Sequence, residues 1–281
     1  MKINSLQLRF AASFIELMMS KKITLFAFLF LATATLNAQP QVLVSGVYHM
    51  NSNEMQNGVE NKMKVKIQGS TTDLNMLSMH SSELAPGKTN HPPHVLMDRE
   101  ELIIVKEGPI TITINETSKT LSSGSIVLIE AGDSQSFYNP SDKIASYYVL
   151  GFKAIAPVNI SRGKENGGSL MKDGNELVVK KTNKGESRPV FDKSTSMFDR
   201  LEVHSTALNT NEDSHPSHTH RAEEIMLLLK GTVTMHIDNV NYKVTPGSVI
   251  LVRPDVTHNL TNTGNESCQY YAIKWYNGST K

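Results

Sequence analysis

The sequence has one cysteine and almost no net charge, and both shortages exclude classes of protein. Because Cys268 is the only thiol among 281 residues, the chain forms neither an internal disulfide nor a cysteine-based zinc site. The 28 lysine and arginine residues are balanced by 27 acidic residues, which gives a formal net charge of +1. Proteins that bind nucleic acid gain affinity by neutralising many phosphates, so this balance excludes a nucleic-acid partner. A composition that is 39% hydrophobic and 20% charged is typical of a globular protein.

The N-terminal segment is typical of an export signal. Lys21 and Lys22 precede an apolar run over residues 23–34, and Ala38 then ends a short stretch that suits cleavage before Gln39. A membrane-spanning helix needs about 20 apolar residues, and this run is shorter. We therefore interpret residues 1–38 as a signal peptide that is cleaved after Ala38. This interpretation predicts a periplasmic or secreted protein without a stable membrane anchor.

The rest of the chain contains one unit twice. Residues 80–94 match residues 204–218, with histidines at both ends of each segment. Further matches at nearly the same offset link residues 100–108 with 223–231 and residues 124–128 with 247–251. The chain then divides into an arm with one or two strands, a first unit, a linker containing a strand near residues 176–179, and a second unit. Their respective ranges are residues 39–69, 70–160, 161–199 and 200–281.

Both units have the pattern of short β-strands. Ile110, Ile112 and Ile114 alternate with threonines, and residues 233–237 repeat this alternation in the second unit. A period of two residues indicates strands with one buried face. No stretch in either unit has a helical period over more than two turns. Many short strands separated by turns predict an all-β protein built from barrels or jelly rolls.

The second unit contains four side chains with metal-ligand spacing. His218 and His220 are two residues apart and Glu224 is four residues further on, so all three share one face if they lie on a regular strand. His258 follows Pro254 at the start of another strand. Three imidazoles and one carboxylate suit a divalent first-row metal, and Mn, Fe, Ni, Co and Zn all fit this donor set.

This pattern resembles the cupin superfamily. The first cupin motif is matched by His218, His220, Glu224 and Gly231, and the second by Gly247, Pro254, His258 and Asn262. The glycine that usually precedes the first motif is absent, and Val256 replaces the glycine near the proline, but neither position supplies a ligand. The resemblance covers both repeats. It implies a bicupin: two tandem cupin barrels (double-stranded β-helix, jelly-roll) that hold one divalent ion through His218, His220, Glu224 and His258.

Other histidines receive different interpretations. His215 lies an odd number of residues from His218 and His220, so we expect a loop residue or a group at the pocket rim rather than a ligand. His80 and His204 occupy equivalent positions in the two units. They either share a structural hydrogen bond or line a pocket. His236 alternates with buried neighbours and is expected to face solvent, and Cys268 is expected to be buried.

The first unit keeps the fold but loses most of the site. His94 and Glu101 are seven residues apart, and an odd separation places them on opposite faces of a regular strand. Met97, which shares the face of Glu101, does not suit a hard divalent ion. Gln135 stands where the second unit has its third histidine. We therefore expect the first barrel to be metal-free. The alternative is a weak site formed by His94, Glu101 and Gln135, with His91 beside them.

The resemblance implies a metal-dependent enzyme of the dioxygenase, isomerase or lyase type that acts on a small polar acid or a sugar-like molecule. In related cupins the ion binds oxygen atoms of the substrate, or it binds dioxygen beside the substrate. Families of similar layout include bicupin dioxygenases, oxalate-degrading enzymes, sugar isomerases and ureidoglycine aminohydrolase, and the fold does not choose among them. The alternative is a non-catalytic, metal-dependent protein that binds or senses a small molecule. No catalytic residue is assigned. Cupins commonly pair through their edges, so the resemblance also implies a homodimer.

Overall fold

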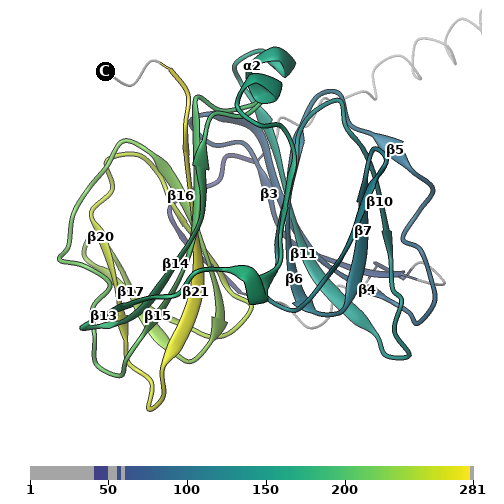
Figure 1. Cartoon of the computed structure of the whole chain (residues 1–281). Helices are drawn as coiled ribbons and strands as arrows, with labels where there is room; N and C mark the ends of the chain where they lie inside the picture. Colours follow the sequence, from purple (N-terminus) through teal and green to yellow (C-terminus); the bar gives the residue numbers. More distant parts are fainter. Residues whose placement is uncertain (1–40, 50–55, 58–60, 279–281) are drawn as a thin grey trace, which may run out of the picture. The chain divides into compact units, whose positions relative to one another are not determined.

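The computed structural model describes residues 41–49, 56–57 and 61–278 (Figure 1). The described residues all belong to one compact unit, residues 40–281. The interpretation of residues 1–38 as a signal peptide lies outside the described residues. No helix in the described part of the chain is both long and apolar enough to cross a membrane.

The architecture is all-β, as the sequence predicts, and two seven-stranded antiparallel sheets repeat one strand order. The first sheet consists, in order, of β12 (Leu170–Lys172), β9 (Ile126–Ile129), β6 (Glu100–Glu107), β11 (Ala145–Ala154), β4 (Leu74–Leu84), β3 (Asn61–Gly69) and β2 (Gln56–Asn57). The second consists of β1 (Gly46–Tyr48), β19 (Val249–Val252), β16 (Glu223–Lys230), β21 (Cys268–Tyr276), β15 (Arg200–Leu208), β14 (Gly185–Lys193) and β13 (Lys180–Thr182).

A smaller sheet packs against each large sheet and completes a barrel. In the first barrel it contains β5 (His94–Val95), β10 (Ser134–Tyr138), β7 (Ile110–Ile114) and β8 (Thr117–Leu121). In the second barrel it contains β18 (Val240–Val244), β17 (Val233–Ile237) and β20 (His258–Asn262). The alternating isoleucines of β7 are buried and pack with residues of β6 and β11, so the two-residue period correctly located the barrel interior.

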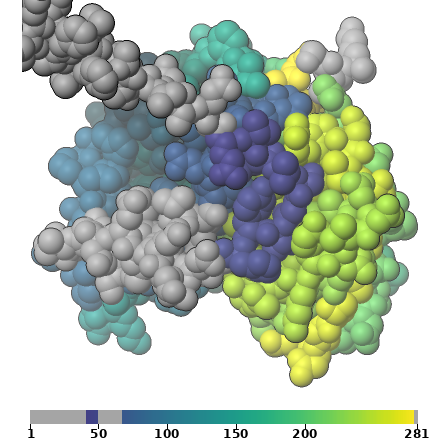
Figure 2. Space-filling view, turned by 180° about the vertical axis from the view of Figure 1, so that it is seen from behind, coloured from purple at the N-terminus to yellow at the C-terminus, as the bar shows by residue number. Residues whose placement is uncertain are grey.

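One edge strand of each barrel comes from the segment of chain that precedes the other barrel. β1, in the N-terminal arm, pairs with β19 of the second barrel, and Figure 2 shows this segment lying against that barrel. β12, in the segment between the barrels, pairs with β9 of the first. Since pairing covers the exposed edge of β9 and of β19, this exchange also joins the two repeats.

The segment between the barrels is more ordered than its polar composition suggests. It contains α2 (Ile160–Glu165) and the 3-10 helix η1 (Gly174–Glu176). The prediction of a strand near residues 176–179 is wrong, because no strand lies between β12 and β13. β13 and β14 instead form the outer strands of the second sheet. Their polar side chains suit the solvated face of an antiparallel sheet, so composition alone concealed them.

A shared apolar core joins the two barrels. Alternate residues of β15, β16 and β21 point away from the second barrel's own interior and pack with residues of β4, β6 and β11. Phe152 of β11 contacts Phe198 and Trp275, with ring centroids 5.4 and 5.5 Å apart. Trp275, the only tryptophan in the sequence, is fully buried in this core.

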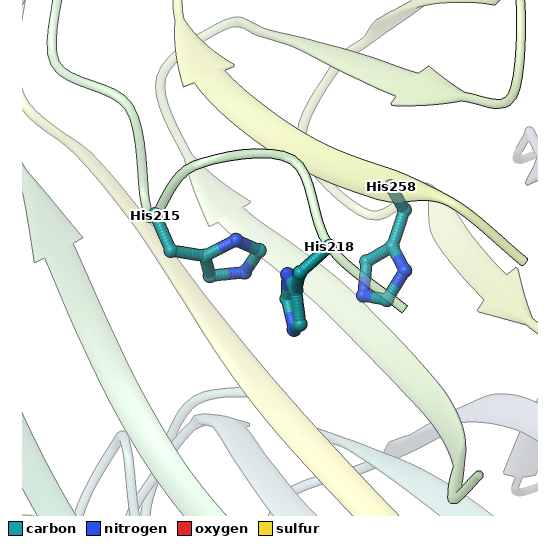
Figure 3. A group of neighbouring side chains, drawn as sticks. All are labelled: His215, His218 and His258. Atoms are coloured by element: carbon teal, nitrogen blue, oxygen red, sulfur yellow. The ribbon is translucent and has the colours of Figure 1, made fainter. Parts of the chain in front are cut away.

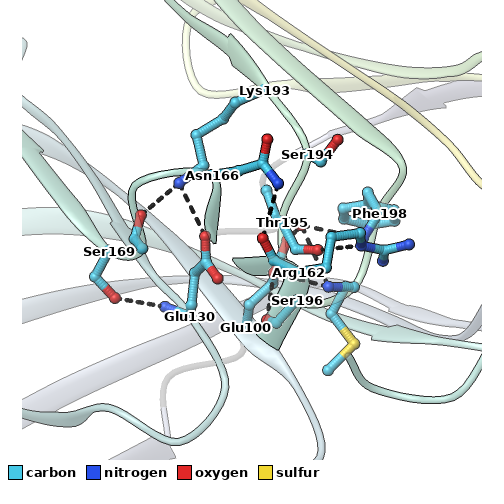
Figure 4. A network of polar contacts seen from close by, with 12 residues as sticks. Glu100, Glu130, Arg162, Asn166, Ser169, Lys193, Ser194, Thr195, Ser196 and Phe198 are labelled. Carbon is cyan, nitrogen blue, oxygen red and sulfur yellow. Dashed lines mark hydrogen bonds and ion pairs between the residues drawn. The ribbon is translucent and has the colours of Figure 1, made fainter. Parts of the chain in front are cut away.

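A buried glutamate from each barrel holds a loop of the other, the loop between β3 and β4 or the loop between β14 and β15. Glu223 accepts hydrogen bonds from the Thr71 hydroxyl at 2.6 Å, from the amides of residues 72 and 73, and from the Trp275 indole. Glu100, at the equivalent position, accepts bonds from the Thr195 and Ser196 hydroxyls and from the amide of residue 197 (Figure 4). Both glutamates are completely inaccessible to solvent. Buried polar contacts therefore lie at two equivalent points of the interface, beside its apolar core.

A second polar contact lies beside Glu100. Glu130, almost fully buried at the end of β9, pairs with Lys193 of β14 at 2.9 Å (Figure 4). The carboxylate of Glu130 also occupies the space beside Gly163 of α2, where a Cβ atom would stand 1.7 Å from Oε2. Only glycine fits at this position, because any side chain would displace a buried ion pair.

Glu100 is expected to make the protein less stable as the pH rises toward neutrality. Burial raises its pKa to about 7, bonds from the Thr195 and Ser196 hydroxyls oppose this shift, and the neighbouring charge of Glu130 adds to it. An unfolded glutamate titrates near 4.5. Between these two values the folded chain keeps a proton that the unfolded chain has released, so the stabilisation is complete below pH 4.5 and is lost as the pH passes 7.

Urea denaturation at pH 5 and pH 7.5 measures this effect. The neutral variant Glu100→Gln lacks the titrating group. The free energy of unfolding of the wild type, relative to this variant, should fall by about 2–3 kcal/mol between the two pH values. The same pH dependence in both proteins would show that Glu100 ionises in the folded state as it does in the unfolded chain.

Candidate metal centre

The two histidines of the first motif lie in a loop rather than in a strand. β16 begins only at Glu223, and His218 reaches the barrel through an isolated bridge in which its backbone exchanges two hydrogen bonds with His258. The regular strand assumed for residues 218–224 is therefore wrong. Pro216, which has no backbone N–H, suits an irregular segment, and the loop is fixed by its bonds to β20 and to Asp255. The side chains converge because this loop folds against a second strand.

Three ligand atoms meet at Glu224. His220 Nε2 lies 3.1 Å from Glu224 Oε2, and His258 Nε2 lies 3.4 Å from the same oxygen. The Nδ1 atom of each ring lies 2.9 Å from a backbone carbonyl, that of Ala222 or of Val256. This contact places a proton on Nδ1 in both rings, so Nε2 is the atom that would bind a metal after losing its own proton. The backbone therefore fixes both the orientation and the tautomer of the two imidazoles.

His218 joins the site from the other side, together with His215. The His218 ring lies 4.7 Å from the His258 ring and 4.0 Å from the His215 ring, which meets it edge-on (Figure 3). Ligand atoms fall within 4.8 Å of one another in two overlapping groups. One contains His220, Glu224 and His258; the other contains His215, His218 and His258. The four residues of the predicted ligand set are thus close neighbours, and His215 is a fifth candidate that strand parity had set aside.

The donor set fits a divalent cation. Burial would raise the pKa of Glu224, but the hydrogen bond from His220, the nearby His258 ring and the charge of Lys274 hold it well below its usual range. Burial lowers the pKa of His218, as do the neighbouring histidines, so this ring is neutral and able to bind a metal. Buried nitrogen atoms of His218 and His258 have no hydrogen-bond partner. A metal ion would satisfy these nitrogens.

The repeat and this site belong to one known family. A family model described as a cupin domain matches residues 80–151 and 205–274, which together make up half of the sequence. The chain belongs to the cupin family. No curated protein sequence matches it. The two matched regions coincide with the two barrels, so the chain is a bicupin, as the motifs predicted.

Solved structures of low sequence identity share this bicupin fold. The chain is similar to oxalate decarboxylase from Lactobacillus farciminis, solved as a formate complex, with a TM-score of 0.66, 13% identity, and coverage of 84% of this chain and 88% of that one. The protein Ylba from E. coli has a TM-score of 0.65 and 15% identity, with coverage of 88% and 97%. AerE from Microcystis aeruginosa has a TM-score of 0.62 and 16% identity, with coverage of 79% and 96%.

The other motif residues of this bicupin have structural roles. Asn262 is fully buried, and its amide group donates to the carbonyl oxygens of residues 208, 209 and 266. Asn139 makes equivalent bonds in the first barrel. Gly231 and Gly247 both have φ of +83°, a conformation that favours glycine at these turns. The second motif thus contributes one candidate ligand, His258, and several residues that hold the turns.

The remaining histidines differ in their surroundings. His204 Nδ1 lies 3.3 Å from Glu202 on the same strand, and His204 and its repeat partner His80 each line a cavity. His236 is half-buried and bonded to Asn241 and Thr261, so it is less solvated than expected. Cys268 is buried, as predicted.

The first barrel brings His94 and Glu101 to one cavity despite their odd separation. They lie in different strands, β5 and β6, joined by a loop, so the strand-parity argument that placed them on opposite faces is wrong. The exposed Met97 lies in this loop. Gln135 takes the place of His258, as predicted: it pairs with His94 as His258 does with His218. Its amide donates to Glu101 at 2.9 Å.

Lys274 lies at the site although no motif in the sequence pointed to it. This residue of β21 lies beside Glu224 in the strand register, and its ammonium group is 3.8 Å from Glu224 Oε2. A lysine within the last strand carries no motif signal by itself. Because it is distant in sequence from the motif histidines, its position beside Glu224 could not be predicted from spacing.

Proposed function

We propose that this protein is an exported, metal-dependent bicupin enzyme whose second barrel binds one divalent ion and acts on a small polar acid. The observation that carries the proposal is the convergence of His220 and His258 on the buried, ionised Glu224, with the neutral His218 beside them. His218, His220, Glu224 and His258 would hold the ion. When bound, the ion would supply Lewis-acid polarisation of substrate oxygens or a binding place for dioxygen.

The protein's own residues define the substrate class. Within the described part of the chain, Lys274 is the lysine or arginine that pairs with a candidate ligand, and it lies only partly exposed beside Glu224. An ammonium group at this position would bind a carboxylate of the substrate and orient it toward the ligands. The backbone carbonyls behind His220 and His258 keep both rings in place while substrate binds and leaves. These features favour an acid over a neutral sugar.

A substrate screen on metal-loaded protein tests the proposed function. The protein is purified without oxygen, its metal content is determined by mass spectrometry, and small acids, beginning with oxalate, and sugars are offered with and without oxygen. We expect one divalent ion per chain and turnover of an acid. Oxygen consumption would separate an oxygenase from an isomerase or a lyase. Binding without turnover of any compound would favour the non-catalytic receptor, and absence of metal would contradict the proposal.

Lys274→Met should weaken recognition of the acid without removing the metal. Hydrogen bonds to charged groups contribute about 1.5–3 kcal/mol, which corresponds to a rise in KM of about 10- to 100-fold. Lys243→Met is the matched control, because Lys243 is exposed on β18 of the same barrel. An unchanged KM in Lys274→Met, with metal retained, would remove Lys274 from the binding site.

The export signal supports placement of this activity in the periplasm or outside the cell. The basic pair at residues 21–22 and the apolar run after it are the supporting features. Expression of the full chain in a Gram-negative host, followed by N-terminal sequencing of the periplasmic fraction, should give Gln39 as the first residue. A cytoplasmic product that begins at Met1 would contradict this placement.

A further inference from the structure

Three residues on neighbouring strands of the second barrel form a row of alternating charge. In the strand register Glu202 lies opposite Lys274, and Lys274 lies opposite Glu224 on its other side. The ammonium group of Lys274 is 3.8 Å from Glu224 Oε2. An internal cation therefore compensates the buried carboxylate of this barrel.

The first barrel has a glutamate, Glu101, at the position of Glu224, but it has no lysine at the position of Lys274. The register places Ser78 opposite Gly151 and Gly151 opposite Glu101, so a glycine occupies the place of Lys274. Among the described residues, no lysine or arginine forms an ion pair with Glu101. The nearby Arg99 pairs with Asp98 instead. Burial raises the pKa of Glu101, because desolvation outweighs the hydrogen bond from Gln135 and the charges of Arg99 and His91.

Glu101 borders a cavity of about 300 Å³ inside the first barrel. Its walls include Phe137 and Tyr147, whose ring centroids are 5.2 Å apart, and the His91 ring packs 6.3 Å from Phe137. The remaining lining residues are His80, Ser82, Asn90, His94, Glu101 and Val149. The cavity therefore combines an aromatic wall with a carboxylate, and its volume exceeds that of a single ion.

Two polar atoms next to Glu101 have no hydrogen-bond partner. Gln135 is 2% exposed, its amide nitrogen donates to Glu101, and its Oε1 atom has no donor. Burial lowers the pKa of His94 and of His80, so both rings are neutral. The Nδ1 atom of His94 is also buried without a partner. A ligand that donates hydrogen bonds and carries positive charge complements the carboxylate of Glu101, whereas an acid would meet that carboxylate with no lysine or arginine ion-paired to it among the described residues.

We propose that the first barrel binds a small organic cation, an ammonium group on an apolar or aromatic body, with Glu101 as its counter-ion and without a metal. The ligand's ammonium group supplies the charge that Lys274 supplies in the second barrel. Its N–H groups donate to the carboxylate of Glu101, and its body packs on Phe137 and Tyr147, where a cation also gains from the ring faces. This site is independent of the metal centre.

Calorimetric titration of the metal-loaded full chain tests this inference. The probes are methylammonium, 2-hydroxyethylammonium and benzylammonium, with benzyl alcohol and benzoate as the neutral and anionic counterparts of the last. We expect one ammonium probe or more to bind once per chain, benzyl alcohol to bind at least tenfold more weakly than benzylammonium, and benzoate not to bind. His258→Ala, which alters only the other barrel, should leave the ammonium affinity unchanged. Loss of metal binding in the second barrel is thereby distinguished from loss of ammonium binding in the first.

Two sets of variants locate the site. Glu101→Gln should lower the ammonium affinity at least tenfold, whereas Glu116→Gln, the same change at an exposed turn of the same barrel, should not. If Glu101→Gln does not fold, Gly151→Lys provides the second test, because it restores an internal cation that competes with the ligand. It is made on Ser78→Ala, since a Cβ at position 151 would stand 2.7 Å from Ser78 Oγ, and Ser78→Ala alone is its control.

Three results would overturn the proposal. The first is that none of the ammonium probes binds the wild type. The second is that benzyl alcohol binds as tightly as benzylammonium. The third is a second metal ion per chain that is lost in Glu101→Gln, which would show that the cavity is a metal site.

Discussion

Replacing His258 with alanine is expected to leave the purified protein without its metal ion. His258 is the only residue that belongs to both groups of converging ligand atoms, and it is 1% exposed. Its Nε2 atom is held toward Glu224 by the contact between Nδ1 and the carbonyl of Val256. Loss of a residue that only supports a ligand weakens metal binding by about 10- to 100-fold, and loss of a ligand itself should weaken it more. Metal analysis after dialysis gives the stoichiometry directly.

Two variants serve as controls for this experiment. Gln135→Ala changes the residue that stands in the place of His258 in the first barrel, and His236→Ala removes a histidine on the second barrel that lies away from Glu224. Both should retain one ion per chain. Glu224→Gln should lose it, because the amide group cannot replace the charge of the carboxylate. Equal metal content in His258→Ala and in these controls would show that the ion binds elsewhere.

His215→Ala tells the two overlapping groups apart. If the ion is held as the cupin motif implies, this variant keeps it, because His218, His220, Glu224 and His258 are intact. Loss of the ion would instead place His215 in the ligand set. His215 is a candidate ligand because its ring contacts the ring of His218 at the same site.

Replacing Glu223 with alanine is expected to cause a large loss of stability. Its carboxylate accepts four hydrogen bonds, and removal leaves the buried indole N–H of Trp275 and the backbone amides of Thr72 and Asp73 without acceptors. Each buried donor left unsatisfied costs about 1–3 kcal/mol, and water entering the space recovers part of this, so we expect a loss of about 3–5 kcal/mol. Urea denaturation followed by circular dichroism measures the change.

The fluorescence of Trp275 reports the same variant locally. It is the only tryptophan, it is fully buried, and its indole bonds to Glu223, so Glu223→Ala should shift its emission to longer wavelength in the folded protein. Glu266→Ala is the control, since Glu266 forms only an exposed ion pair with Lys230, and such pairs contribute about 0–1 kcal/mol. A loss of stability as small as that of Glu266→Ala would mean that Glu223 does not hold the interface.

Adjacent glutamates have different roles in this fold. Glu223 points to the contact between the barrels and Glu224 to the candidate metal centre, because successive side chains of a strand face opposite sides of the sheet. Glu100 and Glu101 repeat the arrangement in the first barrel. The repeat in the sequence contains both pairs, yet only the second member of each pair was recognised as a site residue. The first member depends on a loop of the other barrel, which no local pattern reveals.

The sequence by itself determined the repeat, the all-β class and the family, together with the positions of His218, His220, Glu224 and His258 in the motif. These features depend on spacing and on two-residue alternation, which are local properties of a strand. The tertiary structure alone decided how the histidines converge, which residue stands near Glu224, and how the barrels are joined. The motif histidines lie in a loop that pairs with β20, Lys274 arrives from the last strand, and β1 crosses to the other barrel. Each of these depends on contacts between residues distant in sequence, and periodicity within one segment carries no information about such contacts.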